Sequence, residues 1–208
     1  MLISNEWLKD YVNVDQSVQA LAERITRTGI EVDDIIDYTK DIKKLVVGHV
    51  LSKTPHPDAD KLNICQVDLG EEEPVQIVCG APNVDAGQYV IVAKVGAKLP
   101  GIKIKKAKLR GVESQGMICS LAELGLSKSV VPKNYQEGIY VFETEQELGS
   151  DVVEVLGLND YILDLSITPN RADALSMRGL TYELGALYNN KVDFNDVEKE
   201  ENYEATSL

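Results

Sequence analysis

The sequence predicts an α+β fold in which a small closed β-barrel is inserted into a discontinuous α+β domain. Between Val46 and Leu126, apolar runs alternate with turn-forming clusters at short, regular intervals, which is typical of an all-β barrel. The flanking segments carry helix and strand patterns, but neither has enough apolar surface to be stable alone. We therefore expect an α+β domain from residues 1–40 and 150–192, a barrel over residues 41–149, and a disordered acidic tail over residues 193–208.

The amino-terminal flank is expected to form two helices followed by a strand. Ser4 can cap a short amphipathic helix, and Asp15 can cap a second helix, whose apolar residues recur at three- and four-residue spacing from Val18. Gly29 follows as a helix stop, because glycine readily adopts the left-handed conformation that ends many helices. Apolar residues alternate with acidic ones over residues 30–38, which predicts a strand with one face in water.

Within the barrel segment, apolar runs are expected to be strands separated by turns. The runs are VVGHVL from Val46, LNICQVDL from Leu62, VQIVCGA from Val75 and YVIVAKVGA from Tyr89. Two prolines and two aspartates predict a turn over residues 54–60. Ser120 is expected to cap a short helix over residues 121–124, and residues 138–142 should form a last short strand.

The carboxy-terminal flank is expected to supply a helical turn, a strand and a longer helix. The helical turn covers residues 151–156, and alternating polarity predicts the strand over residues 161–168. Apolar residues at helical spacing from Asp173 predict a helix of about four turns that ends at Asn189 and Asn190.

The charge pattern favours one basic strip on an otherwise acidic chain. The net charge of -13 at pH 7 by itself argues against a nucleic-acid partner, because phosphate contacts need Lys and Arg. However, no acidic residue occurs between Ala86 and Val112, where seven lysine and arginine residues lie. Such a strip would select where a polyanion docks. The alternative is a solvated strand face on which lysines protect a sheet edge.

No set of residues in the sequence makes a convincing catalytic or metal site. His56, Asp58 and Asp60 have metal-ligand side chains, but the chain has only one other histidine, and turn chemistry explains all three. Ser114 and Cys119 lack an adjacent base that would make them nucleophiles. We therefore expect no catalytic residue, no metal site and no cofactor in this chain.

The segment PNRAD, at residues 169–173, also invites a catalytic interpretation. We expect Asn170 or Asp173 to cap the helix that follows and Arg171 to pair with a nearby carboxylate. Turn chemistry therefore explains this segment without catalysis.

A small barrel that presents one face and its loops is suited to binding an oligonucleotide. Such a surface needs cations along the phosphates, hydrogen-bonding side chains at a loop mouth, and glycines where backbone groups approach closely. Tyr89 is the sole aromatic residue in the segment, which favours recognition of a folded RNA by backbone and shape over base stacking. The candidate cations are Lys53, Lys61, Lys105, Lys106, Lys108 and Arg110, the hydrogen-bonding residues are His56, Asn63, Ser114 and Gln115, and the glycines are Gly80 and Gly116.

Three spaced motifs carry a resemblance to a known family. They are PHPDADKL at residues 55–62, VCGAPNV at residues 78–84 with the following AKVGAKLPG, and LRGVESQGMICS at residues 109–120. Together they resemble the tRNA-binding domain of the endothelial-monocyte-activating polypeptide and of methionyl-tRNA synthetase appendices. The resemblance covers about residues 45–126 and implies an oligonucleotide-binding (OB) fold that binds tRNA.

The flanks resemble the amino-terminal portion of the β subunit of bacterial phenylalanyl-tRNA synthetases. The resemblance runs from Met1 to about Val192 and rests on MLISNEWLKDYV, ITRTGIEVDDI and ITPNRADALSMRGLTYELGAL. It implies an α2β2 enzyme that joins phenylalanine to tRNA with ATP and Mg²⁺, with its catalytic site in the α subunit. The editing and anticodon-binding domains of the β subunit would follow this region, so a truncated subunit is expected. The implied partners are tRNA, the α subunit and the remainder of the β subunit.

Three roles stay open for such a chain. It can be an accessory tRNA-binding module, a structural domain that braces the synthetase tetramer, or a free-standing tRNA-binding protein with the same barrel. A cytoplasmic location and no membrane contact are expected, because the amino terminus lacks a signal-peptide pattern and no run reaches the roughly 20 apolar residues of a membrane span. Three widely spaced cysteines without a C-x-x-C pair predict buried free thiols.

Overall fold

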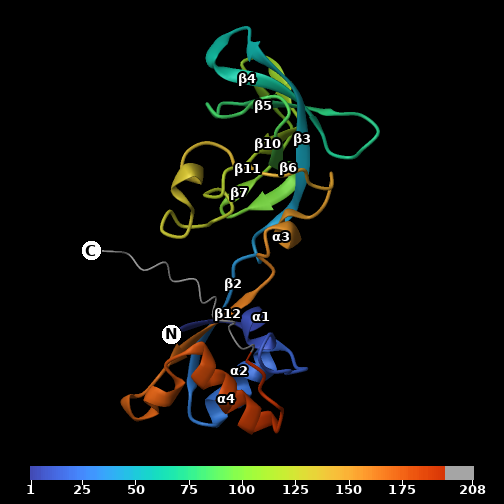
Figure 1. The fold of residues 1–208 in the computed structure, drawn as a ribbon. Coiled ribbons are helices and arrows are strands. Elements are labelled where there is room, and N and C mark those ends of the chain that lie inside the picture. Colours follow the sequence, from blue (N-terminus) through green and yellow to red (C-terminus); the bar gives the residue numbers. More distant parts are fainter. Residues whose placement is uncertain (195–208) are drawn as a thin grey trace, which may run out of the picture. The chain divides into compact units, whose positions relative to one another are not determined.

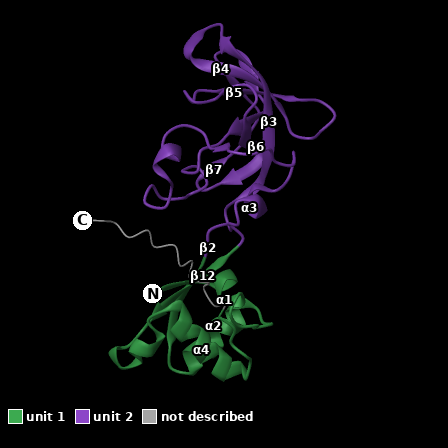
Figure 2. Ribbon diagram, viewed as in Figure 1, with its two compact units in different colours: residues 1–36, 160–208 green, residues 37–159 purple. Residues whose placement is uncertain are grey.

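The computed structural model of the chain describes residues 1–194, which form two compact α+β units (Figures 1 and 2). We name the two units by their order along the sequence. The outer unit combines residues 1–36 with the chain from residue 160 onward, and the inner unit comprises the residues between them, 37–159. Whether each unit is an independently folding domain stays a prediction. The acidic tail expected over residues 193–208 lies outside the described residues, apart from its first two. Along residues 1–194, no helix combines the length and the apolar character needed to cross a membrane.

A three-stranded sheet in the outer unit joins strands from both flanks of the chain. Its order is β1 (Leu2–Ser4), β12 (Tyr161–Ser166) and β2 (Glu31–Asp37), with β1 antiparallel to β12. The helices of this unit are α1 (Asn5–Lys9), α2 (Val18–Arg27), the 3-10 helix η2 (Pro169–Ala174) and α4 (Met177–Tyr188). Its core includes Leu21, Ile25, Leu163, Leu165, Leu180 and Leu184, all buried. Because β12 is the central strand, this sheet forms only when both flanks come together.

The caps of the first two helices agree with the sequence in part. Ser4 caps α1 as expected, since its hydroxyl accepts a hydrogen bond from a backbone N–H in the first turn. The cap of α2 is Ser17 and not Asp15: the Ser17 hydroxyl accepts from the backbone N–H of Ala20 at 3.3 Å. Gly29, with φ of +105°, follows α2 in the left-handed region as expected.

The long helix expected from Asp173 is split in two. Residues 169–174 form η2, and α4 begins at Met177 with Ser176 as its cap, whose hydroxyl accepts from the backbone N–H of Gly179 at 3.0 Å. A Cβ added at Gly179 would lie 1.8 Å from the Asp173 carbonyl oxygen, so the backbone of η2 packs directly against this turn. Asn189, with φ of +52°, ends α4 in the left-handed conformation as expected.

The inner unit is built on an antiparallel seven-stranded sheet (Figure 1). Its main order is β10-β6-β3-β4-β5, and β7 and β11 also pair with β6. The strands are β3 (Lys43–His56), β4 (Ala59–Asp68), β5 (Val75–Cys79), β6 (Tyr89–Leu99), β7 (Ile102–Lys103), β10 (Gly116–Ile118) and β11 (Val141–Phe142). A separate hairpin pairs β8 (Ala107–Leu109) with β9 (Val112–Ser114), and the helices are η1 (Lys133–Tyr135) and α3 (Val152–Val155).

Strand β6 is buried on both faces. Ile91 and Ala93 belong to one hydrophobic core of the inner unit, whereas Val90 and Val92 belong to a second. Successive side chains of a strand point to opposite faces, so a strand between two cores needs a continuous apolar run. The run YVIVA at the start of β6 meets this requirement.

The sheet is open, which corrects the expectation of a closed barrel. No strand ladder within the described residues joins its two ends, β5 and β10. Three hydrogen bonds instead connect β5 to residues 113–115, just before β10. The backbone N–H of Gln115 donates to the Gln76 carbonyl at 2.8 Å, the N–H of Val78 donates to the Ser114 hydroxyl at 3.1 Å, and the side-chain amide of Gln76 donates to the Glu113 carbonyl at 2.7 Å. The sheet therefore curves until its ends are within hydrogen-bonding distance, without completing a barrel.

Two turns differ from those expected. The turn predicted over residues 54–60 is shorter, because β3 continues to His56 and β4 begins at Ala59. Pro55 lies beside a register shift of this ladder, where the missing N–H of proline is tolerated. The helix predicted over residues 121–124 is a hydrogen-bonded turn, in which the backbone N–H of Leu124 donates to Leu121 at 3.2 Å.

Replacing the observed cap of α2 tests its assignment. Ser17→Ala is expected to lower the free energy of unfolding by about 1 kcal/mol, because the Ala20 N–H loses its acceptor. Urea unfolding followed by circular dichroism measures the change. Asp15→Ala is the matched control, with an expected change within about 0.5 kcal/mol. A larger loss for Asp15→Ala than for Ser17→Ala would return the cap to Asp15.

Candidate nucleic-acid interface

The β8–β9 hairpin and the segment before it carry most of the cations predicted from the sequence. Lys105, Lys106, Lys108 and Arg110 are all exposed. The two tip residues, Arg110 and Gly111, have φ of +49° and +86°, which is the sign pattern of a type I′ turn. An arginine rarely adopts the left-handed conformation, which costs a non-glycine residue about 1–2 kcal/mol. Strain of this kind concentrates at functional sites, and here it places a cation at the hairpin tip.

His56 supports the hairpin, and its predicted contact with RNA stays a prediction. The residue is 5% exposed. Its Nε2–H donates to the Leu109 carbonyl of β8 at 3.0 Å, and its Nδ1 accepts from the backbone N–H of Asp58 at 3.0 Å. Both ring nitrogens are therefore occupied within the chain. The imidazole ties the hairpin to the turn between β3 and β4.

Ser114 and Gly116 likewise have structural roles. Ser114 is 3% exposed, and its hydroxyl accepts from Val78 and donates to the Gly116 carbonyl at 3.0 Å. A Cβ added at Gly116 would lie 2.9 Å from the Ala93 carbonyl oxygen, so close packing on β6 already requires glycine there. Gln115 is half-buried, and its side-chain amide donates to a Glu113 oxygen at 2.9 Å.

Ion pairs divide the predicted cations into two groups. The Lys106 ammonium lies 2.8 Å from a Glu113 oxygen, and this hydrogen bond is the main cause that lowers the Glu113 pKa. Lys53 lies 3.8 Å from Asp85. Within residues 1–194, four of the predicted cations have no carboxylate within 4.0 Å: Lys61, Lys105, Lys108 and Arg110. These four are the ones available to phosphates.

A groove of about 600 Å³ lies beside this hairpin. Its lining includes Lys103 and Lys105, the glycines predicted to allow close backbone approach, and the carboxylate residue Glu123. The backbone N–H and hydroxyl of Ser120 donate to Glu123 at 2.6 Å and 2.9 Å, so part of that negative charge is satisfied locally. The groove can accept an extended anionic chain whose phosphates meet the lysines. Asn63, the remaining predicted contact, is half-buried in β4.

The cysteines are buried free thiols, as expected. Burial raises the pKa of Cys119 to about 12 and that of Cys65 to about 11, and it also raises the pKa of Cys79. A neutral thiol is a poor nucleophile and a poor metal ligand. The part of the chain that the structure describes also contains no cluster of three or more His, Cys, Asp or Glu side chains placed to hold a metal ion.

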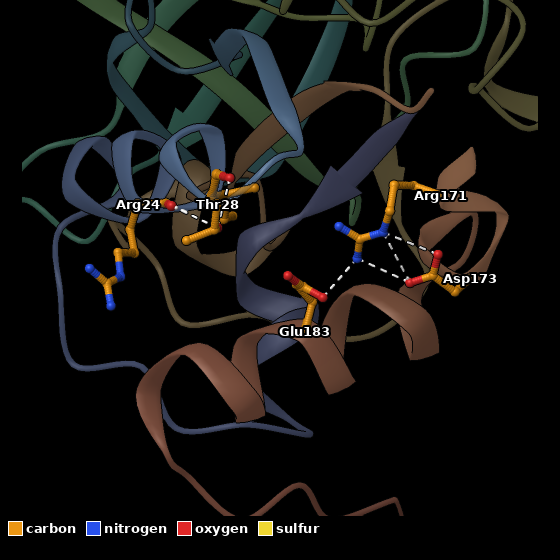
Figure 3. Close-up of polar contacts among 6 residues, drawn as sticks. Arg24, Thr28, Arg171, Asp173 and Glu183 are labelled. Carbon is orange, nitrogen blue, oxygen red and sulfur yellow. Dashed lines mark hydrogen bonds and ion pairs between the residues drawn. The ribbon is translucent and has the colours of Figure 1, made fainter. Parts of the chain in front are cut away.

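The PNRAD segment forms the ion pair expected from the sequence, but not the expected cap. Arg171 donates from Nη2 to Asp173 at 3.0 Å and to Glu183 of α4 at 2.7 Å, which Figure 3 shows. The hydrogen bond from Arg171 is the main cause that lowers the pKa of Asp173. The arginine therefore fastens η2 to α4. Figure 3 also shows the Thr28 hydroxyl donating to the Arg24 carbonyl at the end of α2.

The family model of the putative tRNA binding domain matches residues 45–151, which is just over half of the chain. This chain belongs to the putative tRNA-binding domain family. The matched residues contain the basic hairpin, the groove and nearly all of the inner unit's strands.

Proteins with high overall similarity extend beyond this family match. The chain is 73% identical over 206 residues to a phenylalanine–tRNA ligase beta subunit of Staphylococcus epidermidis, covering 99% of this chain and 26% of that protein. It is 67% identical over 202 residues to the corresponding subunit of Staphylococcus aureus, covering 97% of this chain and 25% of that protein. The resemblance inferred from the flanks is confirmed. The chain spans about a quarter of the length of these relatives.

Parts of the chain resemble solved structures. The C-terminal domain of Plasmodium vivax p43 is 29% identical, with 40% of this chain and 48% of that chain covered and a TM-score of 0.32. A MetRS related protein from Pyrococcus horikoshii is 23% identical, with 51% and 85% covered and a TM-score of 0.36. TM-scores of this size do not establish a common fold, so the barrel assignment does not rest on these structures.

Removing the imidazole at residue 56 tests its structural role. His56→Ala is expected to lower the free energy of unfolding by about 1–3 kcal/mol, because the Leu109 carbonyl and the Asp58 N–H lose their partner. Denaturant unfolding measures the loss, and the exposed Lys61→Ala is a control expected to stay within about 0.5 kcal/mol. If His56→Ala were as mild as the control but weakened RNA binding, the residue would be a direct contact after all.

The raised thiol pKa values predict slow alkylation of the native protein. At pH 8 a thiol of pKa about 12 is ionised in roughly one molecule in ten thousand, and the thiolate is the reacting form. Iodoacetamide labelling followed by mass spectrometry should therefore modify all three cysteines quickly in denaturant and slowly in the folded protein. Rapid labelling of native Cys119 would contradict this environment.

Proposed function

We propose that this chain is a non-catalytic part of a phenylalanine–tRNA ligase β subunit and that its inner unit supplies an accessory tRNA-binding surface. One observation supports this proposal most directly. The family match to a tRNA-binding domain contains free cations in and just before the β8–β9 hairpin, namely Lys105, Lys108 and Arg110, and Lys105 lines a groove of about 600 Å³. Free cations on a protruding element are what a phosphate backbone requires, because their charge is not cancelled by neighbouring carboxylates.

The same proposal assigns an OB-fold to the inner unit. The strand order β10-β6-β3-β4-β5 brings five strands into one curved sheet, and the hydrogen bonds from Gln115 and Val78 link its two ends. An OB-fold is a partly open five-stranded barrel, so an incomplete closure is compatible with it. The domain proposal keeps this barrel, residues 41–149, as an insertion in an α+β domain made of residues 1–40 and 150–192.

The whole enzyme would supply what this chain lacks. In this proposal the α subunit carries the catalytic site that uses ATP and Mg²⁺, and the remainder of the β subunit and the α subunit are protein partners in an α2β2 assembly. The location is cytoplasmic. Support comes from the relatives, whose similarity extends over both flanks as well as the tRNA-binding segment. A free-standing tRNA-binding protein would not need those flanks and is therefore less favoured.

A second candidate function is a scaffold that braces the assembly without touching tRNA. It is favoured by the structural use of His56, Ser114 and Gly116, which were expected to face the RNA, and by the net charge of -13. A scaffold should bind its partner subunits but show no salt-dependent affinity for tRNA.

Titration of tRNA against the chain at two salt concentrations separates the two functions. An RNA-binding module should lose affinity as salt rises, with a log-log slope of about -0.7 to -0.9 per phosphate contact. Lys105→Glu with Lys108→Glu should weaken binding and reduce the slope by about 1–2. Filter binding measures both quantities.

The matched control is Lys128→Glu with Lys133→Glu, two exposed lysines that do not line the groove. It carries the same charge change and should alter affinity much less. Salt-independent or absent binding of the unmodified chain would favour the scaffold. If both double variants weakened tRNA binding equally, the hairpin would not be part of the interface, and the loss of affinity would be a nonspecific effect of charge.

A further inference from the structure

We propose that a second cluster of lysines, where β3, β6 and β7 meet, binds the phosphate backbone of the same RNA. This lysine row consists of Lys43, Lys44, Lys98 and Lys103, and none of these residues was among the candidate contacts from the sequence. The inference rests on the proposed tRNA-binding function and adds a second contact region to it.

The register of the sheet brings three of these lysines into direct line. Lys43 of β3 is the cross-strand partner of Lys98 of β6, and Lys98 is in turn the partner of Lys103 of β7. Like charges directly opposite one another destabilise a sheet. Asp41 offsets only the middle lysine, with its carboxylate 2.5 Å from the Lys98 ammonium. Lys43 and Lys103 have no carboxylate within 4.0 Å in residues 1–194, so this part of the row retains an uncompensated positive charge.

The backbone at Lys44 is a second, independent observation. Lys44 has φ of +61° and lies where the register of β3 against β6 is interrupted. Irregular strand positions of this kind re-aim side chains and are frequent beside functional sites. A Cβ added at Gly96 of β6 would lie 3.5 Å from the Lys44 ammonium nitrogen. The lysine therefore occupies a strained conformation that directs its charge over the neighbouring strand.

Left-handed backbone links the lysine row to the hairpin. Among residues 1–194, three residues other than glycine have positive φ: Lys44, Arg110 and Asn189. Asn189 ends a helix, where this conformation is ordinary. The other two are cations, one in each basic region. The type I′ turn of the hairpin accounts for the backbone of Arg110, and the interrupted register of β3 accounts for that of Lys44. In each basic region a local irregularity of the backbone therefore presents a cation.

A groove of about 490 Å³ gives the row a concave surface. Its lining comprises the four lysines and, between them, Gly96, Leu99, Gly101 and Ile102. Ile102 is 46% exposed, which leaves apolar surface open next to the ammonium groups. Lysines beside an apolar wall suit a nucleotide, since the phosphate meets the charge and the sugar or base covers the wall.

Lys103 lines both this groove and the groove beside the hairpin. The two grooves therefore share a lysine at β7. In the proposal, one RNA path crosses both grooves. A path with two phosphate-contact regions also explains how a chain with a net charge of -13 can hold a polyanion at one place.

The competing explanation is protection of a sheet edge. β7 has only β6 as a sheet neighbour, and exposed lysines on edge strands prevent aggregation. That explanation predicts self-association when the lysines are neutralised, without any change in RNA affinity. A binding site predicts weaker RNA binding and no self-association when the lysines are neutralised.

The test is tRNA filter binding by the 208-residue chain with Lys43→Gln and Lys44→Asn. Asparagine tolerates the left-handed conformation, so this variant removes two charges without adding strain at residue 44. We expect roughly tenfold weaker binding at low salt and a salt slope reduced by about 1–2. Lys128→Gln with Lys133→Gln is the charge-matched control, expected to change affinity less than threefold. Circular dichroism verifies that the variants fold. Lys103→Gln is a second variant that removes one charge instead of two and should weaken tRNA binding less.

Combining the lysine-row and hairpin variants distinguishes the possible failures. If both regions contact phosphates independently, their losses of binding free energy should add. If the unmodified chain does not bind tRNA, the proposed function fails and this inference fails with it. If the hairpin variant weakens binding but the lysine-row variant behaves like its control, only this inference is overturned. Self-association of the lysine-row variant with unchanged affinity would likewise overturn it and identify an edge guard.

Discussion

The inner unit depends on the burial of β6 between two hydrophobic cores. This strand pairs with β3, β7, β10 and β11, and its side chains alternate between the cores. Close packing against β6 also limits which residues fit on the neighbouring strands. At Gly48 of β3, an added Cβ would lie 2.8 Å from a Val92 methyl carbon, and at Gly116 of β10 it would lie 2.9 Å from a backbone oxygen of β6. Close packing against the central strand therefore requires glycine at residues 48 and 116.

Both basic regions are attached to this rigid centre. The hairpin is held by buried polar groups, because His56 bonds to Leu109 and Ser114 bonds to both sides of the opening between β5 and β10. The lysine row begins where β6 leaves its regular pairing with β3 and turns into β7. Exposed cations on a rigid scaffold lose less entropy on binding than cations on a flexible tail.

The sequence predicted the main strands and most helices, because apolar periodicity and cap chemistry are local signals. It failed where two local signals compete or where packing decides. Asp15 and Ser17 are both good caps two residues apart, and propensity alone does not choose between them. The break before α4 depends on the contact of Gly179 with the Asp173 carbonyl, which no local pattern reveals. The open sheet depends on how far β5 and β10 approach, which is also a long-range property.

The candidate site was predictable in its charges but not in its buried polar groups. The run without acidic residues singled out Lys105, Lys108 and Arg110, which the structure shows to be exposed, and their contact with RNA stays a prediction. The structural role of His56 was not predicted, because its partner Leu109 is 53 residues away in sequence. Lys98 and Lys103 belong to the basic strip of the sequence, but their grouping with Lys43 was missed because Lys43 and Lys98 become neighbours only through strand register.

The discontinuous sheet of the outer unit affects the order in which the two units can fold while the chain is being synthesised. Every strand of the inner unit lies between the two segments that build the β1-β12-β2 sheet. A ribosome adds roughly 5–20 residues per second, so β12 emerges on the order of ten to thirty seconds after β1. During that interval the first flank lacks the central strand of its sheet, and all strands of the inserted unit, which end at β11, are synthesised before β12. In the nascent chain, the sheet of the inserted unit can therefore form before the β1-β12-β2 sheet, although β1 is synthesised first.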